Sequence, residues 1–282
     1  MANTERLGLP KARLAFFAAT FASCGLFAYA LLYGGVSPLF TVLWLCGYVA
    51  LSTVGVLVPQ LEMYGNVVAR LPKGRNCVAL TFDDGPHPVT TTAVLDLLEN
   101  RGQRATFFVI GEKAEQYPDI VRRIHAGGHT LGLHGFTHAR LYSFKSPRVV
   151  RDDIVRTQDA LERICGVRPT LFRPPIGYVS HRTAAGARAA GVTTVVWSVR
   201  GLDGFGPTSR ARVVRRIQRK LEDGAIVMLH DAAEREQFEP AGVGALPDIL
   251  DTLDRAGLRS RGLEELLGSD DGRDDEPARR SV

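Results

Sequence analysis

The chain has 282 residues, of which 45% are hydrophobic and 23% are charged, and its 35 basic and 30 acidic side chains leave a formal net charge of +5. This composition excludes a largely disordered or collagen-like chain, and the basic excess is too small and too scattered for a nucleic-acid-binding surface. The charge is unevenly placed, however, because residues 14–61 contain no Asp, Glu, Lys or Arg. That gap argues against a plain soluble globule.

The uncharged stretch predicts a membrane hairpin. Residues 14–33 and 39–58 are two apolar runs of twenty residues each, and Gly-Gly-Val-Ser-Pro lies between them as a turn signal. Each run is long enough to cross a hydrocarbon core of about 30 Å as a helix, and the short turn makes the two helices antiparallel. A cleaved signal peptide or a lipid anchor followed by a buried helix remains the alternative.

Basic residues flank the predicted hairpin on one side only. They precede the first run at Arg6, Lys11 and Arg13 and follow the second at Arg70, Lys73 and Arg75, whereas the connecting turn carries no charge. The positive-inside rule therefore predicts an integral protein of the bacterial cytoplasmic membrane with both flanks, and the whole downstream domain, in the cytoplasm. The external face is the alternative.

The expected domain organisation follows from these changes in composition. It comprises a tail over 1–13, a transmembrane hairpin over 14–58, a linker over 59–75, a catalytic domain over 76–267 and a polar tail over 268–282. The last segment has no apolar periodicity, so we expect it to be disordered.

Short apolar runs alternate with amphipathic segments from residue 76 onward. Strands are predicted at 77–82, 105–110, 129–133, 170–172, 193–198 and 225–229. Helices are predicted at 90–100, 112–126, 146–165, 182–190, 209–221 and 243–256, with a last short strand and helix before residue 267. This alternation predicts an α/β fold with a parallel sheet, closed into a barrel or a distorted (β/α) barrel.

Functional side chains gather at the carboxyl ends of strands in parallel α/β folds, and here several predicted strands end in such residues. They are Asp83, Asp84, His134, Arg173, Arg200 and His230. Because these ends meet at one rim, we expect carboxylates, imidazoles and a guanidinium to lie close together there.

A histidine pair suggests metal binding. His134 and His138 are four residues apart, so in a helical turn both imidazoles face the same way. Together with one strand-end carboxylate they make three ligands and leave positions open for water and substrate, which is typical of a catalytic metal site.

Four segments resemble the motifs of the NodB-type polysaccharide deacetylases, carbohydrate esterase family 4. They are TFDDGP at residues 81–86, HGFTH at 134–138, RPPIG at 173–177 and MLH at 228–230. The motifs occur in the order found in the family, and the resemblance covers about residues 76–267, with the membrane hairpin outside it. It implies the distorted (β/α) barrel of that family.

The resemblance also implies a metal-dependent hydrolase that removes N-acyl groups from amino sugars of a polysaccharide or a lipid-linked glycan. Asp84, His134 and His138 would hold one divalent ion, zinc first, with cobalt, nickel or manganese as alternatives. Asp83 would be the general base that takes a proton from water. His230 would be the general acid that protonates the departing amine.

Further roles carry over from the same motifs. Arg173 would keep Asp83 ionised and oriented, and the backbone N–H of Tyr178 would stabilise the oxyanion. Substrate contacts are expected from Pro175, Trp197 and Leu229, with Tyr178 also facing the acyl group.

One segment departs from the family pattern. An acidic DxxDW-type motif is common in the family, but here Arg200 stands at the first acid and Gly204 at the tryptophan. An arginine beside His230 would lower the pKa of that imidazole, and Asp203 is expected to compensate by pairing with Arg200 or by reaching His230. A non-catalytic carbohydrate-binding or assembly component, or a deformylase or amidase acting on another sugar amide, therefore remains an alternative. The sugar, the acyl group and the oligomeric state stay open.

Overall fold

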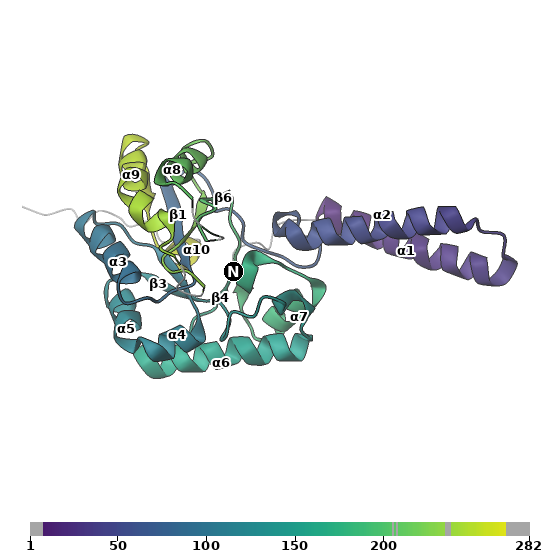
Figure 1. Ribbon diagram of the computed structural model, residues 1–282, viewed down its shortest axis with the longest axis horizontal. Coiled ribbons are helices and arrows are strands. Elements are labelled where there is room, and N and C mark those ends of the chain that lie inside the picture. Colours follow the sequence, from purple (N-terminus) through teal and green to yellow (C-terminus); the bar gives the residue numbers. More distant parts are fainter. Residues whose placement is uncertain (1–7, 205, 207, 235–237, 269–282) are drawn as a thin grey trace, which may run out of the picture.

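The computed structural model describes residues 8–204, 206, 208–234 and 238–268. Arg6, most of the predicted N-terminal tail and nearly all of the predicted polar tail lie outside these residues. A two-helix hairpin extends from an α/β domain, and its free end lies far from that domain (Figure 1).

The hairpin consists of α1 (Lys11–Tyr33) and α2 (Pro38–Leu57). Both helices are long and apolar enough to cross a membrane. Most of their large apolar side chains are exposed; Phe21 and Leu32, for example, are 77% and 74% exposed. Two polar contacts join the helices: Thr20 Oγ1 lies 3.1 Å from the Tyr48 hydroxyl, and Trp44 Nε1 donates to Ser23 Oγ at 2.9 Å.

The α/β domain packs against the end of the hairpin where α1 begins and α2 ends. A short 3-10 helix, η1 (Pro59–Leu61), follows α2, and Gln60 Nε2 donates to the Trp197 carbonyl at 3.0 Å. Arg13 reaches across to Asn66 Oδ1 at 2.9 Å. These bonds tie the hairpin to the domain that carries the predicted motifs.

The sheet of the α/β domain is parallel, with the strand order β5-β4-β3-β2-β1-β7-β6, and β8 pairs with the start of β1. The strands are β1 (Cys77–Asp83), β2 (Thr106–Val109), β3 (Thr130–Leu133), β4 (Leu171–Phe172), β5 (Thr193–Thr194), β6 (Val199–Arg200), β7 (Ile226–His230) and β8 (Arg259–Ser260). Every residue of the central strand β1 is buried, as expected where helices cover the outside of a parallel sheet. The strand order ends at β5 on one side and at β6 on the other, and these two edge strands do not pair with each other. The curled sheet is therefore an incompletely closed, distorted barrel, which confirms the predicted fold class.

Helices surround the sheet (Figure 1). They are α3 (Thr90–Asn100), α4 (Gly111–Gln116), α5 (Pro118–Ala126), α6 (Pro147–Cys165), α7 (His181–Ala189), α8 (Arg210–Gln218), α9 (Ala241–Arg255) and α10 (Leu263–Gly268), with the 3-10 helices η2 (Tyr142–Phe144) and η3 (Pro175–Gly177). The prediction of one helix over 112–126 is wrong. Pro118 has no backbone N–H and sits at the first position of α5, so the chain breaks between α4 and α5.

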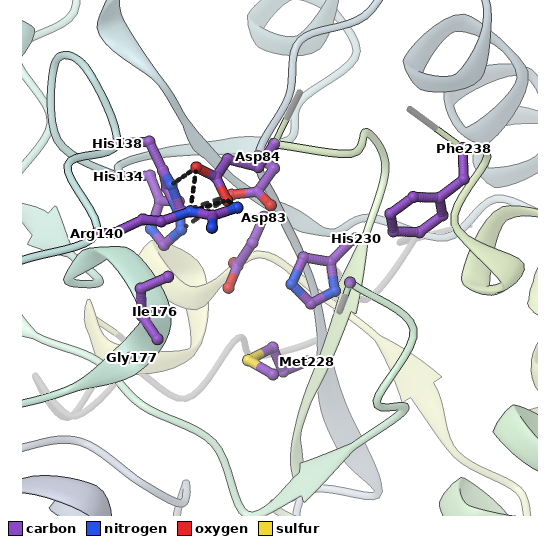
Figure 2. A pocket seen from close by; sticks show the side chains of 12 residues that line it. Asp83, Asp84, His134, His138, Arg140, Ile176, Gly177, Met228, His230 and Phe238 are labelled. Atoms are coloured by element: carbon purple, nitrogen blue, oxygen red, sulfur yellow. Dashed lines mark hydrogen bonds and ion pairs between the residues drawn. The ribbon is translucent and has the colours of Figure 1, made fainter. Parts of the chain in front are cut away.

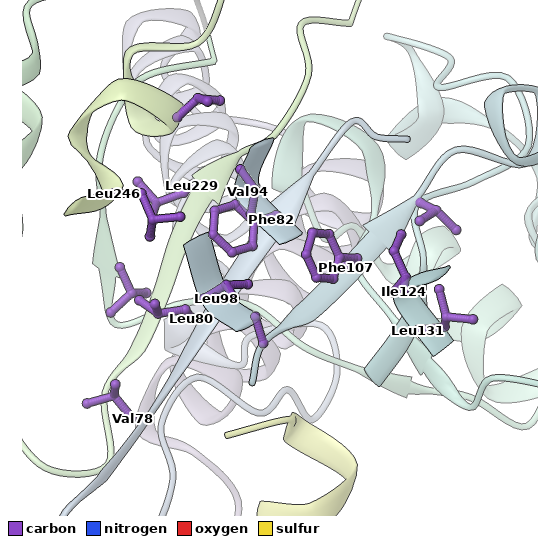
Figure 3. Packing of buried hydrophobic residues seen from close by; sticks show 14 of the residues in the cluster. Val78, Leu80, Phe82, Val94, Leu98, Phe107, Ile124, Leu131, Leu229 and Leu246 are labelled. Atoms are coloured by element: carbon purple, nitrogen blue, oxygen red, sulfur yellow. The ribbon is translucent and has the colours of Figure 1, made fainter. Parts of the chain in front are cut away.

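The hydrophobic core lies between the sheet and its helices (Figure 3). The Phe82 and Phe107 rings stack at 5.2 Å between centroids, and Val94, Leu98 and Leu246 pack around them from the helices. Side chains alternate along a strand, so Phe82 points into this core while its neighbours Thr81 and Asp83 face the inside of the curled sheet. The core therefore fixes the strand that carries the first motif.

The strand predicted at 193–198 is interrupted after β5. The buried Arg173 side chain accounts for this, because its Nη2 donates to the Val196 carbonyl at 3.1 Å and its Nε to the Val195 carbonyl at 3.4 Å. Val195 also bridges to Val68 from the linker. The Val195 and Val196 carbonyls thus accept from Arg173, while the Val196 N–H donates to the Val68 carbonyl of the linker at 2.9 Å, and regular pairing resumes only at β6.

Candidate active site

The carboxyl ends of the central strands bring the predicted site residues together. In the parallel pairing of β1 with β7, Asp83 is the register partner of His230. In the pairing of β3 with β4, Leu133 is the partner of Phe172, so His134 and Arg173 follow side by side. Asp83, His134 and His230 line one cavity of about 340 Å³, and the buried Arg173 contacts Asp83. His230 lies on the opposite side of Asp83 from His134 and His138 (Figure 2).

Asp83 is held by a fully buried arginine. Arg173 Nη1 donates to Asp83 Oδ1 and to Thr81 Oγ1, both at 2.7 Å, and its Cζ lies 4.1 Å from the centre of the Phe108 ring. The Arg173 side chain is 0% exposed and that of Asp83 is 3% exposed. A charge-assisted bond shielded from water in this way fixes the orientation of the carboxylate.

Asp84, His134 and His138 form a compact cluster, and one ligand atom from each lies within 4.8 Å of the others. Asp84 Oδ1 is 3.3 Å from His134 Nε2 and 3.2 Å from His138 Nε2. The expectation of a helical turn for the histidine pair is wrong: residues 134–138 form a loop in which Gly135 has φ 77° and His138 has φ 49°. The loop, rather than helical spacing, brings the two rings together.

The cluster fits a cation. The carbonyl of Arg173 can only accept, so His134 Nδ1, at 2.8 Å, carries the proton and its Nε2 presents a lone pair in the neutral ring. That lone pair faces Asp84 Oδ1, a buried oxygen that accepts no hydrogen bond in the described part of the chain. Lone pairs directed at one another in a buried place repel unless a positive ion lies between them. The two imidazoles and one carboxylate are the donor set of a catalytic divalent metal.

The protonation states suit the same interpretation. Burial alone would raise the pKa of Asp84, but the positive potential of His230 helps to hold it well below its usual range. Burial and the neighbouring His134 lower the pKa of His138. The cluster thus offers an anionic oxygen and a neutral imidazole as ligands.

His230 is paired with Asp203. Its Nδ1 lies 3.0 Å from Asp203 Oδ1, and its backbone N–H donates to Asp203 Oδ2, also at 3.0 Å. Burial alone would lower the pKa of His230, but the negative charges of Asp203 and Asp84 raise it above its ordinary value. Asp203 is fully buried, whereas Arg200 is exposed. The expected lowering of the His230 pKa by Arg200 is therefore wrong, and Asp203 reaches His230 directly.

The expected substrate contacts need correction. Leu229 is 0% exposed and packs in the core, because alternation along β7 turns it away from the cavity and turns Met228 toward it. Trp197 and Pro175 are buried behind the loop that lines the cavity, where Trp197 packs on Gly177. Gly177 has φ 77°, and a Cβ there would lie 2.3 Å from the indole ring.

Tyr178 follows the cavity-lining residues Ile176 and Gly177. Its side chain is half-buried and is not among those that line the cavity. Its backbone N–H donates to no acceptor in the described part of the chain. That donor stays available for a bound group.

Sequence reasoning missed several cavity residues. Glu234 and Arg140 form a forked ion pair at the rim, and Glu234 Oε1 lies 3.6 Å from His138 Nδ1. Phe238 lines the far side near His230 (Figure 2). None of them belongs to the four motifs, and all come from loops whose path the strand–helix pattern does not predict.

Sequence reasoning also missed a buried lysine. Lys113 of α4 donates from Nζ to the Asp84 carbonyl at 2.9 Å and to the Ala233 carbonyl at 2.8 Å. It therefore ties the loop after β1, which carries a metal-ligand candidate, to the loop after β7.

Comparison with known proteins agrees with this geometry. Residues 70–195 match the family described as polysaccharide deacetylase. A peptidoglycan-N-acetylglucosamine deacetylase of Bacillus cereus is 36% identical over 212 residues, covering 74% of this chain and 96% of that protein. A chitooligosaccharide deacetylase of Bradyrhizobium sp. is 34% identical over 216 residues, covering 72% of this chain and 94% of that protein.

A solved structure gives the same result. The Bc1960 peptidoglycan N-acetylglucosamine deacetylase, in complex with an N-hydroxybenzamide, superposes with a TM-score of 0.66 and 30% identity. The superposition covers 72% of this chain and 92% of that one. The chain therefore belongs to the polysaccharide deacetylase family, as its four motifs predicted.

Proposed function

We propose that this protein hydrolyses the N-acyl amide of amino sugars in a glycan, with the help of one divalent metal ion. The observation that carries the proposal is the convergence of three groups on one cavity: the Asp84–His134–His138 cluster, the Asp83–Arg173 pair and the His230–Asp203 pair. The two relatives are named for deacetylation of peptidoglycan N-acetylglucosamine and of chitooligosaccharide, which supports an N-acetylated hexosamine as the substrate.

Asp84, His134 and His138 would hold the ion. Two imidazoles and a carboxylate suit zinc first, with cobalt, nickel and manganese as alternatives. When bound, such an ion supplies Lewis acidity toward the acyl carbonyl and makes a water molecule more acidic.

The residues of the chain supply the proton transfers and the orientation. Asp83, held at Oδ1 by Arg173, takes the proton of the attacking water on its other oxygen. The backbone N–H of Tyr178 donates to the oxygen that becomes negative as the carbonyl is attacked. These roles follow the sequence prediction for all three residues.

His230 delivers the second proton. Asp203 holds its Nδ1, and the ring atoms around Nε2 lie against Gly204, where an added Cβ would come within 2.4 Å of that nitrogen. Gly204 and His230 both line the cavity. The Nε2 proton passes to the departing amine, which leaves poorly from an amide unless it is protonated.

The proposed activity is tested with the purified full chain and N-acetylglucosamine oligomers or peptidoglycan fragments. We expect release of acetate and of one free amine for each acetate. A chain that binds metal stoichiometrically but releases no acyl group from any N-acylated glycan would instead be a non-catalytic carbohydrate-binding component. Release from other sugar amides alone would indicate the amidase or deformylase alternative.

The role of Asp203 predicts a change in pH dependence. His230 must be protonated to act, and its raised pKa keeps it protonated as the pH rises past neutrality. Asp203→Asn removes the charge that raises this pKa, so the alkaline limb of kcat/KM should move to lower pH by roughly one unit or more. The pH profile of Asp248→Asn, which changes an acid of α9 that pairs with Arg210 at the surface, is the control and should match the wild type. An unmoved alkaline limb in Asp203→Asn would exclude His230 as the acid.

We also propose that α1 and α2 span the bacterial cytoplasmic membrane and that the α/β domain lies on its cytoplasmic face. The exposed apolar side chains of both helices and the basic residues at the domain end, Lys11, Arg13, Arg70, Lys73 and Arg75, support this orientation. A cytoplasmic site would act on a lipid-linked glycan, and an external one on a polymer.

Cysteine labelling tests this orientation. In a cysteine-free background, Ser37→Cys in the hairpin turn should react with a membrane-impermeant maleimide in intact cells, whereas Ser281→Cys in the C-terminal tail should react only after lysis. The reverse pattern would place the domain outside. A hairpin that is extracted by alkaline carbonate would contradict the membrane span itself.

A further inference from the structure

A second cavity, of about 670 Å³, lies where the end of α2 meets the α/β domain. We call it the basic groove, after the five basic residues that line it: Arg70, Arg200, Arg216, Arg219 and Lys220. Its lining also includes apolar residues, among them Leu57 and Val58 at the end of α2 and Trp197. The groove thus combines charged and apolar side chains.

The charge of the basic groove is largely uncompensated. In the part of the chain that the structure describes, the side chains of Arg200, Arg219 and Lys220 form no ion pair and no hydrogen bond. Arg216 donates only to the Gly201 carbonyl, at 2.9 Å, and Arg70 alone pairs with an acid, Glu222. Elsewhere in the domain, arginines such as Arg101, Arg123 and Arg168 pair with carboxylates. A concentration of unpaired guanidinium groups favours an anionic ligand.

The basic surface continues along α8. Arg212 and Arg215 lie with Arg216 and Arg219 around one further shallow depression. Their spacing of three and four residues places them on adjoining turns of the helix. The four residues also form no ion pair with any described acidic side chain. The positive field is therefore a property of the whole helix face.

The position of the basic groove identifies the source of the anion. Leu57 is the last residue of α2, and Val58 and Pro59 follow it, so the apolar span ends at the wall of the groove. If the hairpin crosses a bilayer, this is the depth at which lipid phosphates lie, and Trp197 is an aromatic residue at the same place. A soluble phosphate would use only the basic side chains, whereas a lipid uses the basic and the apolar ones.

We propose that the basic groove binds an anionic phospholipid of the bilayer that the hairpin spans. The guanidinium groups of Arg200, Arg216 and Arg219 bind the phosphate, because their planar donors match its oxygens in pairs. The first part of the acyl chains lies along Leu57 and Val58. This inference rests on the proposed membrane hairpin and is independent of the deacetylase activity.

Binding at this place would also fix the orientation of the active site. Arg200 is the register partner of Met228 in the pairing of β6 with β7, and Met228 lines the catalytic cavity. The segment from Arg200 to Gly204 lies between the two cavities, since Leu202 lines the basic groove and Gly204 lines the active site. A lipid held there presents the catalytic cavity to the membrane surface at a fixed angle.

Native mass spectrometry of the full chain in a neutral detergent tests the proposal. The probes are phosphatidylglycerol and phosphatidylcholine with identical acyl chains. We expect the wild type to retain phosphatidylglycerol preferentially. A basic residue near an anionic lipid contributes about five-fold to affinity, so Arg216→Gln/Arg219→Gln/Lys220→Gln should bind it about a hundred-fold more weakly.

Two further variants keep the test interpretable. Arg101→Gln/Arg122→Gln/Arg123→Gln removes the same charge from the side of the domain that carries α3 and α5, and it should bind phosphatidylglycerol like the wild type. Arg219→Gln/Lys220→Gln leaves the Arg216 bond to Gly201 intact and replaces the triple variant if that one proves unstable. It should bind phosphatidylglycerol about 25-fold more weakly than the wild type.

Three outcomes would overturn the proposal. The first is an unchanged lipid preference in both groove variants, and the second is an equal loss of phosphatidylglycerol affinity in the Arg101→Gln/Arg122→Gln/Arg123→Gln control. The third is displacement of phosphatidylglycerol by an equal concentration of inorganic phosphate. The last would identify a site for a free anion. The measurement uses neither a glycan substrate nor a topology signal, so its failure is distinct from failure of the proposed activity or of the proposed orientation.

Discussion

Replacing Asp83 with asparagine is expected to lower kcat/KM for acetate release by roughly 10³-fold, because general base catalysis of this kind contributes about 10²–10⁴-fold. The asparagine keeps the shape of the side chain and its bond from Arg173, but it cannot accept the proton of water. Metal content should stay at the wild-type level, because Asp83 is not among the three clustered ligand residues. Loss of activity with retained metal separates the role of Asp83 from that of Asp84.

The control for this variant is Asp152→Asn, which changes an exposed acid on α6 and should leave kcat/KM unchanged. Both proteins are compared at equal concentrations of folded protein, as judged by the thermal unfolding transition. A decrease of less than about ten-fold in Asp83→Asn would mean that another group accepts the proton.

Replacing Arg173 with methionine is expected to affect both stability and activity. Arg173 and Asp83 are a buried pair, and removing one partner of such a pair costs about 3–5 kcal/mol because the other charge is left uncompensated. The carbonyls of Val195 and Val196 also lose their donor, which loosens the segment after β5. We expect a lower Tm and a decrease in kcat/KM of at least about 10²-fold.

Arg168→Met is the matched control for this substitution. Arg168 is exposed and pairs with Asp159 and Glu162 at the surface, so its loss should cost less than about 1 kcal/mol of unfolding free energy. Arg173→Lys keeps the charge but loses the paired donors, and we expect it to recover stability better than activity. Equal effects of Arg173→Met and Arg168→Met on denaturant unfolding would contradict the buried ion pair.

Much of the site could be predicted from the sequence, because the chemistry is carried by residues next to strand ends. The motif residues Asp83, Asp84, His134, Arg173 and His230 all line or support one cavity, since parallel strands bring their carboxyl ends to one rim. The fold class was predictable for the same reason, as buried parallel strands read as apolar runs between amphipathic helices.

What the sequence left unpredicted depends on loops and on side-chain direction. Leu229 and Met228 are both apolar, and their sequence does not say which of them faces the cavity; the register of β7 decides it. Glu234 and Lys113 reach the metal-ligand loops through long-range contacts that no local pattern encodes. Arg200 ends β6 much as other rim residues end or follow their strands, but its side chain is exposed and lines the basic groove instead of the active-site cavity.

For the hairpin, too, the sequence predicts the helices but not their contacts with the domain. Length and composition predicted two apolar helices, and both are present as α1 and α2. The contacts that join them to the domain, such as Gln60 to the Trp197 carbonyl, link residues far apart in the chain and create the basic groove. Hydropathy alone says nothing about such a groove.

The central claim is that the Asp84–His134–His138 cluster binds the divalent ion on which amide hydrolysis depends. Its most direct test is a zinc titration of the metal-stripped full chain, with bound zinc and acetate release from an N-acetylglucosamine oligomer measured in the same samples. The account predicts that activity rises in step with zinc to one ion per chain, and that His134→Ala neither binds zinc tightly nor regains activity. Full activity in the stripped protein, or unchanged zinc-dependent activity in His134→Ala, would contradict it.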